Sequence, residues 1–295
     1  MNLGNIKFIL YLKLSIVIII GLSACSIQTD SHQPKVLKVS VQPSQSNQND
    51  LKLLYFPLMK YLEKELSIKI VWVKVNNYQH QLDKFHNGEL DLALFGGFAF
   101  VKALARDNAD PLVMRDIDFR FTSYFLVAKD NKVSDISELQ GQSFSFGSKL
   151  STSGHIMPRF FLSTQDIVPE KFFSQVLYSG AHDLTALWVQ EGKVDVGVAN
   201  SIVVDKLFKN RALSKSKVRI LWKTPHYPDY VWAARKNLSA TIKAKIIEAF
   251  IKMSADNEQH KKLLELVGAN YYMPANSDDF EPIRKIAIQF NLLDE

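Results

Sequence analysis

Cysteine is almost absent from this chain, in which Cys25 is the only one among 295 residues. A single cysteine excludes an intramolecular disulfide and any metal site built from several thiolates. Histidine motifs for metal binding are absent too: there is no H-E-x-x-H, and His80 and His86 lie six residues apart, on nearly opposite sides of a helix. We therefore expect neither a metal nor a cofactor.

The sequence also offers little material for catalysis. It has no G-x-S-x-G nucleophile elbow, and its candidates for a nucleophile and a base are limited to Ser153, His155 and the pair His182-Asp183. Pairs of acidic residues at helical spacing are typical of a solvated surface. We therefore predict a binding protein rather than an enzyme.

Charge of one sign is only slightly in excess. The 36 lysines and arginines against 30 acids give a formal charge of +6, and basic residues in stretches such as 60–64 and 243–252 stand beside acids. No basic stripe with interleaved aromatic residues is present, which argues against nucleic acid as a partner. The small positive balance is compatible with an anionic ligand but does not demonstrate one.

Long apolar runs are absent beyond the N-terminus. Two lysines precede an apolar run at 14–21, which is shorter than the roughly 20 residues of a membrane span. Residues 1–25 are therefore predicted to be a signal peptide. Its end, Leu22-Ser23-Ala24-Cys25, resembles a bacterial lipobox, which predicts that Cys25 is lipidated. A plain secretory signal with an incidental cysteine is the alternative.

Residues 26–36 are polar and poor in apolar side chains, as expected of a flexible tether. The mature chain of about 270 residues is long enough for two lobes with separate cores. We expect it in the cell envelope, lipid-anchored on the periplasmic or extracytoplasmic face of a bacterial membrane.

Strand and helix patterns alternate along most of the chain. The expected strands are 37–41, 69–75, 90–95, 112–117, 124–129, 144–147, 175–178, 194–199, 218–222 and 231–235. The expected helices are 51–66, 79–87, 98–107, 152–164, 183–190 and 201–208, followed by a purely helical part at 239–255, 258–267 and 277–290. This alternation predicts an α/β protein with mainly parallel sheets.

One sequence pattern occurs twice, at 85–93 and at 188–197. In each copy a helix end is followed by glycine, a short polar step and a strand that begins near an aspartate, and the glycine supplies a left-handed helix cap. Ligands of open α/β sheets bind at the carboxyl ends of strands. Two such units indicate two similar lobes that face a common cleft.

The most informative segment is 146–158, in which a short strand and a turn lead to Ser151-Thr152-Ser153 at the expected start of a helix. Free backbone N–H groups and the positive end of the dipole make such a start suitable for binding an oxyanion. Hydroxyl side chains can add hydrogen bonds to the same anion. An ordinary N-cap is the alternative interpretation of these three residues.

Several fragments, in this order and spacing, resemble the phosphate/phosphite/phosphonate-binding proteins of bacterial ABC importers. The fragments are 55–66, Tyr78, 88–99, 146–158, 179–183, 192–197 and 220–228, and the resemblance extends from about residue 37 to at least residue 237. It implies a two-lobed periplasmic-binding-protein fold of type II, with crossings between lobes near 127–129 and 222–225. Lobe 1 would then comprise 37–126 and 225–295, and lobe 2 would comprise 127–224.

The resemblance also implies a ligand-binding set, which consists of Tyr78, Ser151, Thr152, Ser153, His182 and Asp229. Tyr78 offers a hydroxyl, and His182 donates from one nitrogen when neutral and from both when protonated. Asp229 could accept the proton of a P–OH group. The alternatives are an interface tyrosine, a histidine near a helix cap and an acid in a turn.

Together these features predict an extracytoplasmic lipoprotein that captures a small phosphorus oxyanion, either a phosphonate, phosphite or phosphate, and delivers it to the permease of an ABC importer. We expect it to act as a monomer. Residues 200–203 are neutral where aminoalkylphosphonate binders carry an acid, which argues against an ammonium-bearing ligand. Input to a membrane sensor, or binding of another anion such as a sulfonate, are the alternative functions.

Overall fold

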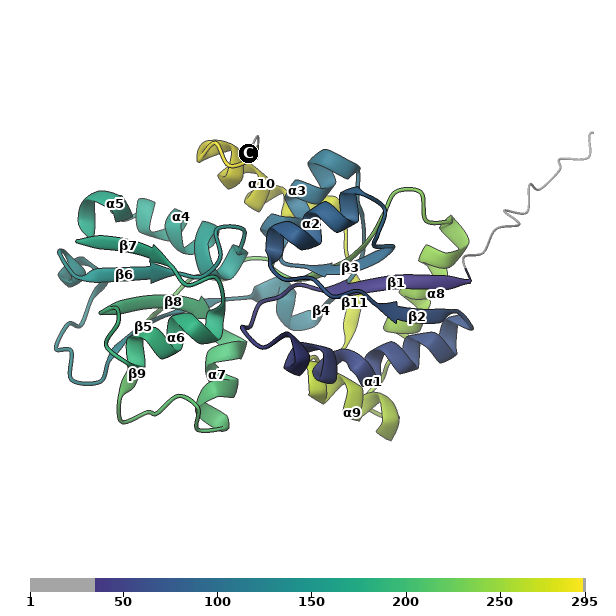
Figure 1. The fold of residues 1–295 in the computed structure, drawn as a ribbon, viewed down its shortest axis with the longest axis horizontal. Helices are drawn as coiled ribbons and strands as arrows, with labels where there is room; N and C mark the ends of the chain where they lie inside the picture. The colour runs from purple at the N-terminus through teal and green to yellow at the C-terminus, as the bar shows by residue number, and fades with distance from the viewer. Residues whose placement is uncertain (1–34, 294–295) are drawn as a thin grey trace, which may run out of the picture. The chain divides into compact units, whose positions relative to one another are not determined.

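Two β-sheets organise the part of the chain that this computed structural model describes, residues 35–293 (Figure 1). The first sheet has the order β11-β4-β10-β3-β1-β2 and contains β1 (Val36–Val41), β2 (Lys69–Trp72), β3 (Leu92–Phe95), β4 (Asp110–Arg115), β10 (Val231–Ala234) and β11 (Tyr272–Pro274). The second has the order β7-β6-β8-β5-β9 and contains β5 (Ser123–Ala128), β6 (Ser143–Phe146), β7 (Gln175–Tyr178), β8 (Val196–Asn200) and β9 (Val218–Lys223).

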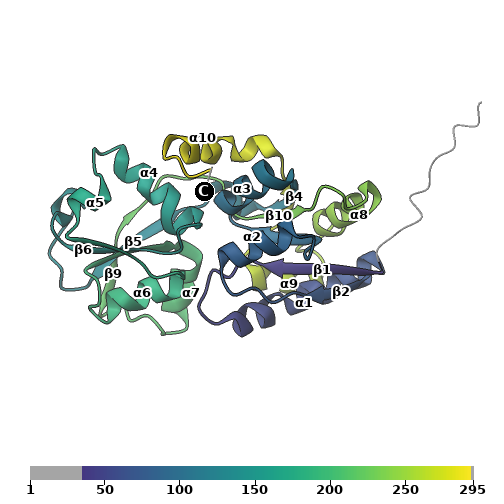
Figure 2. The same ribbon diagram turned by 45° about the horizontal axis from the view of Figure 1, so that its top comes forward.

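Helices from both ends of the described chain cover the first sheet. They are α1 (Gln48–Leu66), α2 (Tyr78–His86), α3 (Gly97–Asp107), α8 (Ala240–Ile251), α9 (Glu258–Val267) and α10 (Glu281–Gln289). α8 packs against α1 and β4. α10 packs against α3, and Figure 2 shows these two helices side by side. The C-terminal helices therefore complete the core around the first sheet, to which Trp232 and Phe280 belong.

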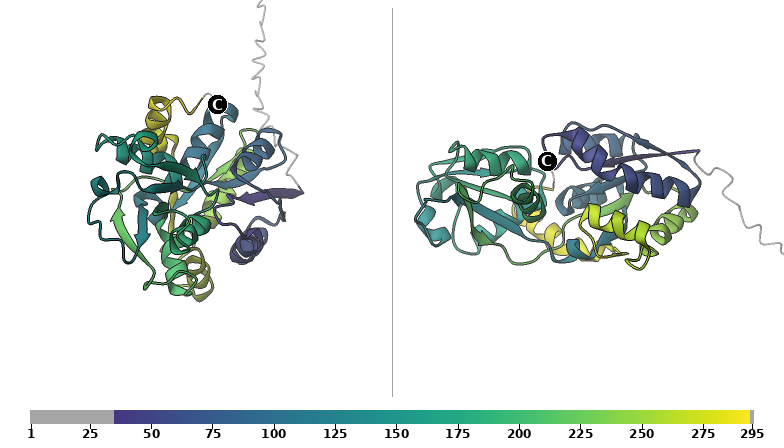
Figure 3. Two further views of the ribbon diagram at one scale, coloured as in Figure 1. Left: turned by 60° about the vertical axis from the view of Figure 1, so that its left-hand side comes forward. Right: turned by 90° about the horizontal axis from the view of Figure 1, so that it is seen from below.

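The second sheet carries its own helices, which are α4 (Met157–Ser163), α5 (Pro169–Phe172), α6 (His182–Gln190) and α7 (Ser201–Lys209). Two apolar clusters, one around Phe144 and one around Leu126, fill the two faces of this sheet. In the right-hand view of Figure 3 this teal and green segment lies on the left, and the purple segment and the yellow-green helices lie on the right. The expected α/β architecture with two lobes is confirmed.

The sheets are mixed, and the expectation of mainly parallel sheets is wrong. β10 runs antiparallel to both β3 and β4, and β5 runs antiparallel to both β8 and β9. Each of these strands enters its sheet directly from the other one, at the edge where the helix-connected strands end. Each of these two strands therefore begins at that edge, where its neighbours end, and is antiparallel to them.

Two segments cross between the sheets, at 116–122 and 224–230, and they pair with each other. The N–H of Phe121 donates to the carbonyl of Tyr227 at 2.8 Å, and the reverse bond is 3.1 Å long. The first crossing lies before the predicted 127–129, which is the end of β5, whereas the second overlaps the predicted 222–225. The predicted lobe boundary after residue 126 falls inside β5, and the boundaries as a whole stay a prediction.

Other differences concern short or irregular elements. The strand β11 and the single-turn helix α5 were not expected, since each is too short to show a period. The expected helix at 152–164 begins as a π-helical turn, Thr152–Ile156, before it continues as α4. The signal peptide, Cys25 and the tether up to residue 34 lie outside the described residues. Within 35–293, no helix is long and apolar enough to cross a membrane.

Candidate ligand-binding site

Four helices begin where the six predicted site residues meet. α2 begins at Tyr78, α3 at Gly97, the π-helical turn at Thr152 and α6 at His182. The six predicted side chains are all buried, with exposed fractions of 0 to 3%. The structure therefore brings together residues that span positions 78 to 229, from both sheets and from the second crossing.

The three hydroxyl residues at the π-helical turn have different partners. Ser151 is the N-cap, and its Oγ accepts the N–H of Gly154 at 2.9 Å, so the ordinary capping role is correct for this residue. Thr152 Oγ1 accepts the N–H of Phe98, at the start of α3, at 2.9 Å. Ser153 Oγ is buried and has no hydrogen-bond partner within the described residues. Of the three hydroxyls, only that of Ser153 forms no hydrogen bond of good geometry, although it lies near the Asp229 carboxyl group and the Tyr227 phenol.

Gly154 lets this turn approach α6 closely. A Cβ at Gly154 would lie 2.8 Å from His182 Cε1 and 3.0 Å from Ser151 Oγ, which is too close for a side chain. His182 Nε2 lies 3.4 Å from Ser151 Oγ. The glycine therefore fixes the imidazole edge against the hydroxyl turn.

His182 is a neutral imidazole with a defined tautomer. Burial lowers its pKa to about 3, and Nδ1 accepts the backbone N–H of Asn200 at 3.2 Å. The ring proton must then sit on Nε2, which faces Ser151. Of the two forms expected, burial without a carboxylate partner favours the neutral one, which donates from one nitrogen.

Tyr78 and Asp229 complete the set with a hydroxyl donor and a carboxyl group. Burial raises the pKa of Tyr78, against the opposing effect of a hydrogen bond with the Ser151 side chain, so the phenol stays protonated. Burial and then the nearby Asp118 raise the pKa of Asp229 to about 7. Asp229 Oδ1 accepts the N–H of Gly97 at 3.2 Å, while Oδ2 is buried and has no partner within the described residues.

The positive electrostatic character of this site comes from backbone amides. Within residues 35–293, no lysine or arginine shares a hydrogen bond with the six predicted side chains. The starts of four helices place the positive ends of their dipoles here instead, although the N–H groups of Gly97, Phe98 and His182 already donate to protein acceptors. Such an arrangement binds a small anion without neutralising it by a counter-charge.

Two contributions were missed by the sequence reasoning. The N–H groups of Gly97 and Phe98 hold Asp229 and Thr152 in place, and the Gly96-Gly97 pair after β3 was the available signal. Asn200 orients His182 through its backbone, which no sequence pattern indicates. Within the described residues, no group of histidine, cysteine, aspartate and glutamate is arranged to hold a metal ion.

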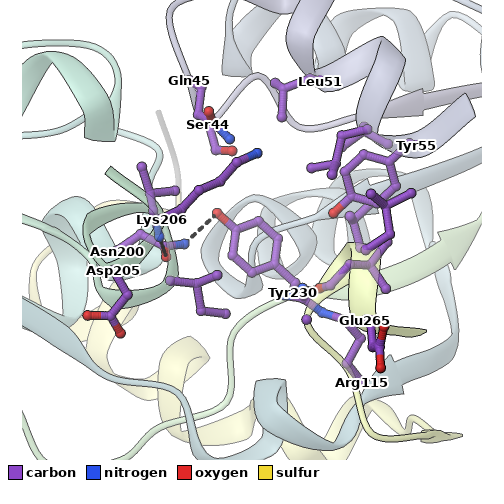
Figure 4. A pocket seen from close by; sticks show the side chains of 18 of the residues that line it. Ser44, Gln45, Leu51, Tyr55, Arg115, Asn200, Asp205, Lys206, Tyr230 and Glu265 are labelled. Carbon is purple, nitrogen blue, oxygen red and sulfur yellow. Dashed lines mark hydrogen bonds between the residues drawn. The ribbon is translucent and has the colours of Figure 1, made fainter. Parts of the chain in front are cut away.

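A cavity of about 710 Å³ adjoins the site beyond Asn200 and Tyr230. In Figure 4 the Tyr230 ring lies in its centre, and the Asn200 side chain donates to the Tyr230 hydroxyl, at 3.2 Å. Arg115 and Glu265 lie on its far wall. None of the six predicted site residues lines this cavity.

Residues 40–280 match a protein family described as "ABC transporter, phosphonate, periplasmic substrate-binding protein". The chain belongs to this family. It is 33% identical over 274 residues to the probable ABC transporter phosphite binding protein PhnD1 of Prochlorococcus marinus, covering 88% of this chain and 91% of that protein. It is 27% identical over 263 residues to the phosphonates-binding periplasmic protein of Escherichia coli, covering 87% and 77%.

The solved structure of Prochlorococcus marinus PhnD1 in complex with methylphosphonate has a similar fold, with a TM-score of 0.82 and 32% sequence identity over 88% of this chain and all of that one. The predicted type II periplasmic-binding-protein fold is therefore confirmed. A member of this family is the substrate-binding component of a transporter and not an enzyme. Its place is outside the cytoplasm, and its partners are a small ligand and a permease.

Proposed function

We propose that this protein captures a small phosphorus oxyanion at the site formed by Tyr78, Ser151, Thr152, Ser153, His182 and Asp229, and delivers it to an ABC importer. The observation that carries this proposal is the meeting of four helix starts at a buried site without a basic side chain. Phosphite and methylphosphonate, which the names of the Prochlorococcus relative and of its structure mention, are small oxyanions of this kind.

The unused polar atoms support a ligand that carries one acidic proton. Ser153 Oγ can donate to an unprotonated oxygen, and so can His182 Nε2 once it leaves Ser151. Asp229 Oδ2, when ionised, can only accept, and a P–OH group of the ligand would supply the donor. A monoprotonated phosphorus oxyanion supplies both kinds of oxygen, whereas a sulfonate at neutral pH has no proton to donate.

The ligand we propose carries no ammonium group. Asn200 forms hydrogen bonds to Tyr230 through its side chain and to His182 through its backbone, and it presents no charge there. An ammonium group placed at this end of the site would lose its hydration and would find no carboxylate to pair with, which makes its binding unfavourable. Phosphite and methylphosphonate therefore fit better than aminoethylphosphonate.

A thermal-shift panel tests this function. A ligand at about 1,000 times its Kd stabilises the folded state by about 4 kcal/mol. We expect phosphite and methylphosphonate to raise the Tm most, aminoethylphosphonate to raise it less, and sulfate and taurine to leave it unchanged. Phosphate is the sixth compound of the panel. A rise in Tm with taurine or sulfate alone contradicts the proposal, and so does an unchanged Tm with all six compounds.

We also propose that Cys25 is lipidated and holds the protein on the membrane, with the polar residues after it as a tether. The support is the Leu22-Ser23-Ala24-Cys25 sequence behind a short apolar run. Cys25→Ser should leave an unprocessed or released protein, as measured by mass spectrometry and membrane fractionation. The same mass and the same membrane fraction as the parent would exclude a lipid on this residue.

A further inference from the structure

Gln42 is a buried glutamine directly after β1, a strand that pairs with both β2 and β3. Its backbone is held firmly, since its N–H donates to the carbonyl of Leu94 at 2.9 Å and its carbonyl accepts the N–H of Ser44 at 2.8 Å. Its exposed fraction is 1%. The side chain therefore starts from a rigid position at the edge of the sheet where the proposed ligand site lies.

The Gln42 amide is satisfied on one side only. Its Oε1 accepts the backbone N–H of Gly96, so that its Nε2 carries two hydrogens on the other side. Nε2 is buried and has no hydrogen-bond partner within the described residues. A buried donor without an acceptor is uncommon in native proteins and calls for an explanation such as a missing ligand.

Gly96 shows how close Gln42 comes to the site. A Cβ at Gly96 would lie 3.0 Å from Gln42 Oε1, 3.1 Å from Asp229 Oδ1 and 3.2 Å from Thr152 Oγ1. Three side chains from the first sheet, the second crossing and the π-helical turn thus surround one point. A residue larger than glycine would push them apart.

The unpartnered atoms of the described chain concentrate here. Five buried side-chain polar atoms lack a hydrogen bond, and three of them belong to Gln42, Ser153 and Asp229. The Ser153 side chain lies near the Asp229 carboxyl group, and Gln42 approaches the same carboxyl group across Gly96. These three side chains therefore lie close together around the Asp229 carboxyl group, and they supply an amide donor, a hydroxyl and a carboxyl acceptor.

We propose that Gln42 is a specificity-determining ligand contact, whose Nε2 donates to an unprotonated oxygen of the phosphorus oxyanion while Asp229 accepts its P–OH. This inference rests on the proposed function. Gln42 gives the first lobe a neutral donor opposite Ser153, so that the ligand is held from both lobes. Because an amide donor cannot receive a proton from the ligand, Gln42 and Asp229 together define which oxygen is protonated.

Two substitutions test the role of the donor. Gln42→Glu keeps the shape and the acceptor for the Gly96 N–H, but it replaces the donor by an oxygen that carries negative charge or competes for the P–OH. Gln42→Met removes the donor and adds no charge. By isothermal titration with methylphosphonate and phosphite, we expect Gln42→Met to raise the Kd about ten- to hundred-fold, the value of a hydrogen bond to a charged group, and Gln42→Glu to raise it further.

Gln81 offers a matched control in the same lobe. It is also a buried glutamine, but its Nε2 donates to Ser40 Oγ at 2.9 Å and to the carbonyl of Leu94 at 3.3 Å. We expect Gln81→Met to lower the Tm and to leave the Kd within about two-fold of the parent, since its donors serve the fold. The Tm of each variant without ligand separates a folding defect from a binding defect.

The outcomes distinguish this inference from the proposed function. A parent protein that binds methylphosphonate or phosphite, together with a folded Gln42→Met or Gln42→Glu variant of unchanged Kd, overturns the role of Gln42 alone. A parent that binds neither anion overturns the proposed function. Equal losses of affinity in the Gln42→Met and Gln81→Met variants also reject the inference, because they assign Gln42 a general structural effect.

Discussion

Thr152 Oγ1 accepts the backbone N–H of Phe98 at 2.9 Å and so joins the π-helical turn beside the second sheet to the start of α3 beside the first. The neighbouring Ser153 hydroxyl has no partner within the described residues. Two adjacent hydroxyls at one helix start thus differ in role, since one links the lobes and the other is free for a ligand.

This difference predicts opposite effects on stability. Thr152→Ala should lower the free energy of unfolding by about 1 kcal/mol, because the Phe98 N–H loses its acceptor. Ser153→Ala should leave stability unchanged or higher, because it removes a buried hydroxyl without a partner. If Ser153 contacts the oxyanion, its loss should still raise the Kd about ten- to hundred-fold.

Urea unfolding and isothermal titration on the same samples check both variants. Ser151→Ala serves as the reference for a helix cap, which costs about 1 kcal/mol of stability when removed. An unchanged Kd for Ser153→Ala, with methylphosphonate as ligand, would show that Ser153 does not contact the ligand.

The neutral His182 makes a prediction about pH. Its pKa is lowered to about 3 in the folded protein, against an ordinary value near 6.5. Above pH 6.5 both states are neutral, whereas between pH 6.5 and 3 only the unfolded state takes up the proton. The free energy of unfolding should therefore fall as the pH drops below about 6.5. Burial lowers the pKa of His155 to about 4, which acts in the same direction.

His182→Gln separates this effect from binding. The substitution should flatten the fall of stability between pH 6.5 and 4, because it removes one of the two buried imidazoles. It should also weaken methylphosphonate binding by a factor that does not change between pH 6.5 and 8.5, since the neutral ring is the donor throughout. A loss that grows with rising pH would instead indicate that an imidazolium binds the ligand.

A second contact between the lobes joins the loop after β1 to the start of α6. Asp183, near the start of α6, accepts the Ser46 N–H at 2.9 Å and the Ser46 hydroxyl at 2.5 Å. Ser44 accepts the His182 N–H at 3.0 Å beside it. These bonds join the two lobes directly over the site, so we expect them to form when the lobes close around the ligand.

Small-angle scattering measures this closure. The parent should have a smaller radius of gyration with saturating methylphosphonate than without it. Asp183→Ala should raise the Kd by about five- to ten-fold, the value of about one such bond, while Asp205→Ala in α7, away from these bonds, should not. A radius that does not change on ligand binding speaks against closure.

Much of the fold could be predicted from the sequence. The periods of two and of 3.6 residues located α9 and β7 with their observed bounds. The first crossing was misplaced because residues 119–128 contain no glycine or proline, so that the pattern gives no sign of where the chain changes sheets. β11 has three residues, too few for any period.

The sequence predicted which residues lie together, but not the contacts that they make. Helix-start physics and the family resemblance indicated the six residues that the structure brings together. The tautomer of His182 depends on Asn200, and the position of Thr152 depends on Phe98. These contacts join segments that are far apart in the sequence and exist only once the two lobes meet, so no local pattern can predict them.

Asp229 gives the strongest test of how the site chooses its ligand. Burial and the nearby Asp118 raise its pKa to about 7, against an ordinary value near 3.9. Between pH 3.9 and 7 the folded state binds a proton that the unfolded state does not, so the contribution of this group to stability falls as the pH rises through that range and stays low above pH 7. The ionised carboxylate is thus a cost to the fold at neutral and higher pH.

Asp229→Asn should remove this cost and change the ligand preference. At pH 8 the variant should exceed the parent in free energy of unfolding by about 1 to 3 kcal/mol, the cost of a buried polar group without a partner, and at pH 5 the two should be nearly equal.

If the amide oxygen keeps the Gly97 N–H, the amide nitrogen replaces Oδ2 and donates where the parent accepts. The variant should then bind methylphosphonate less tightly at pH 7, where about half of the parent's Asp229 is ionised and can accept the ligand's proton, and should acquire affinity for sulfate, which carries none. Urea unfolding at both pH values and titration with both anions check this. A variant that is less stable than the parent at pH 8, or that binds methylphosphonate as tightly and still rejects sulfate, would show that Asp229 does not accept the ligand's proton.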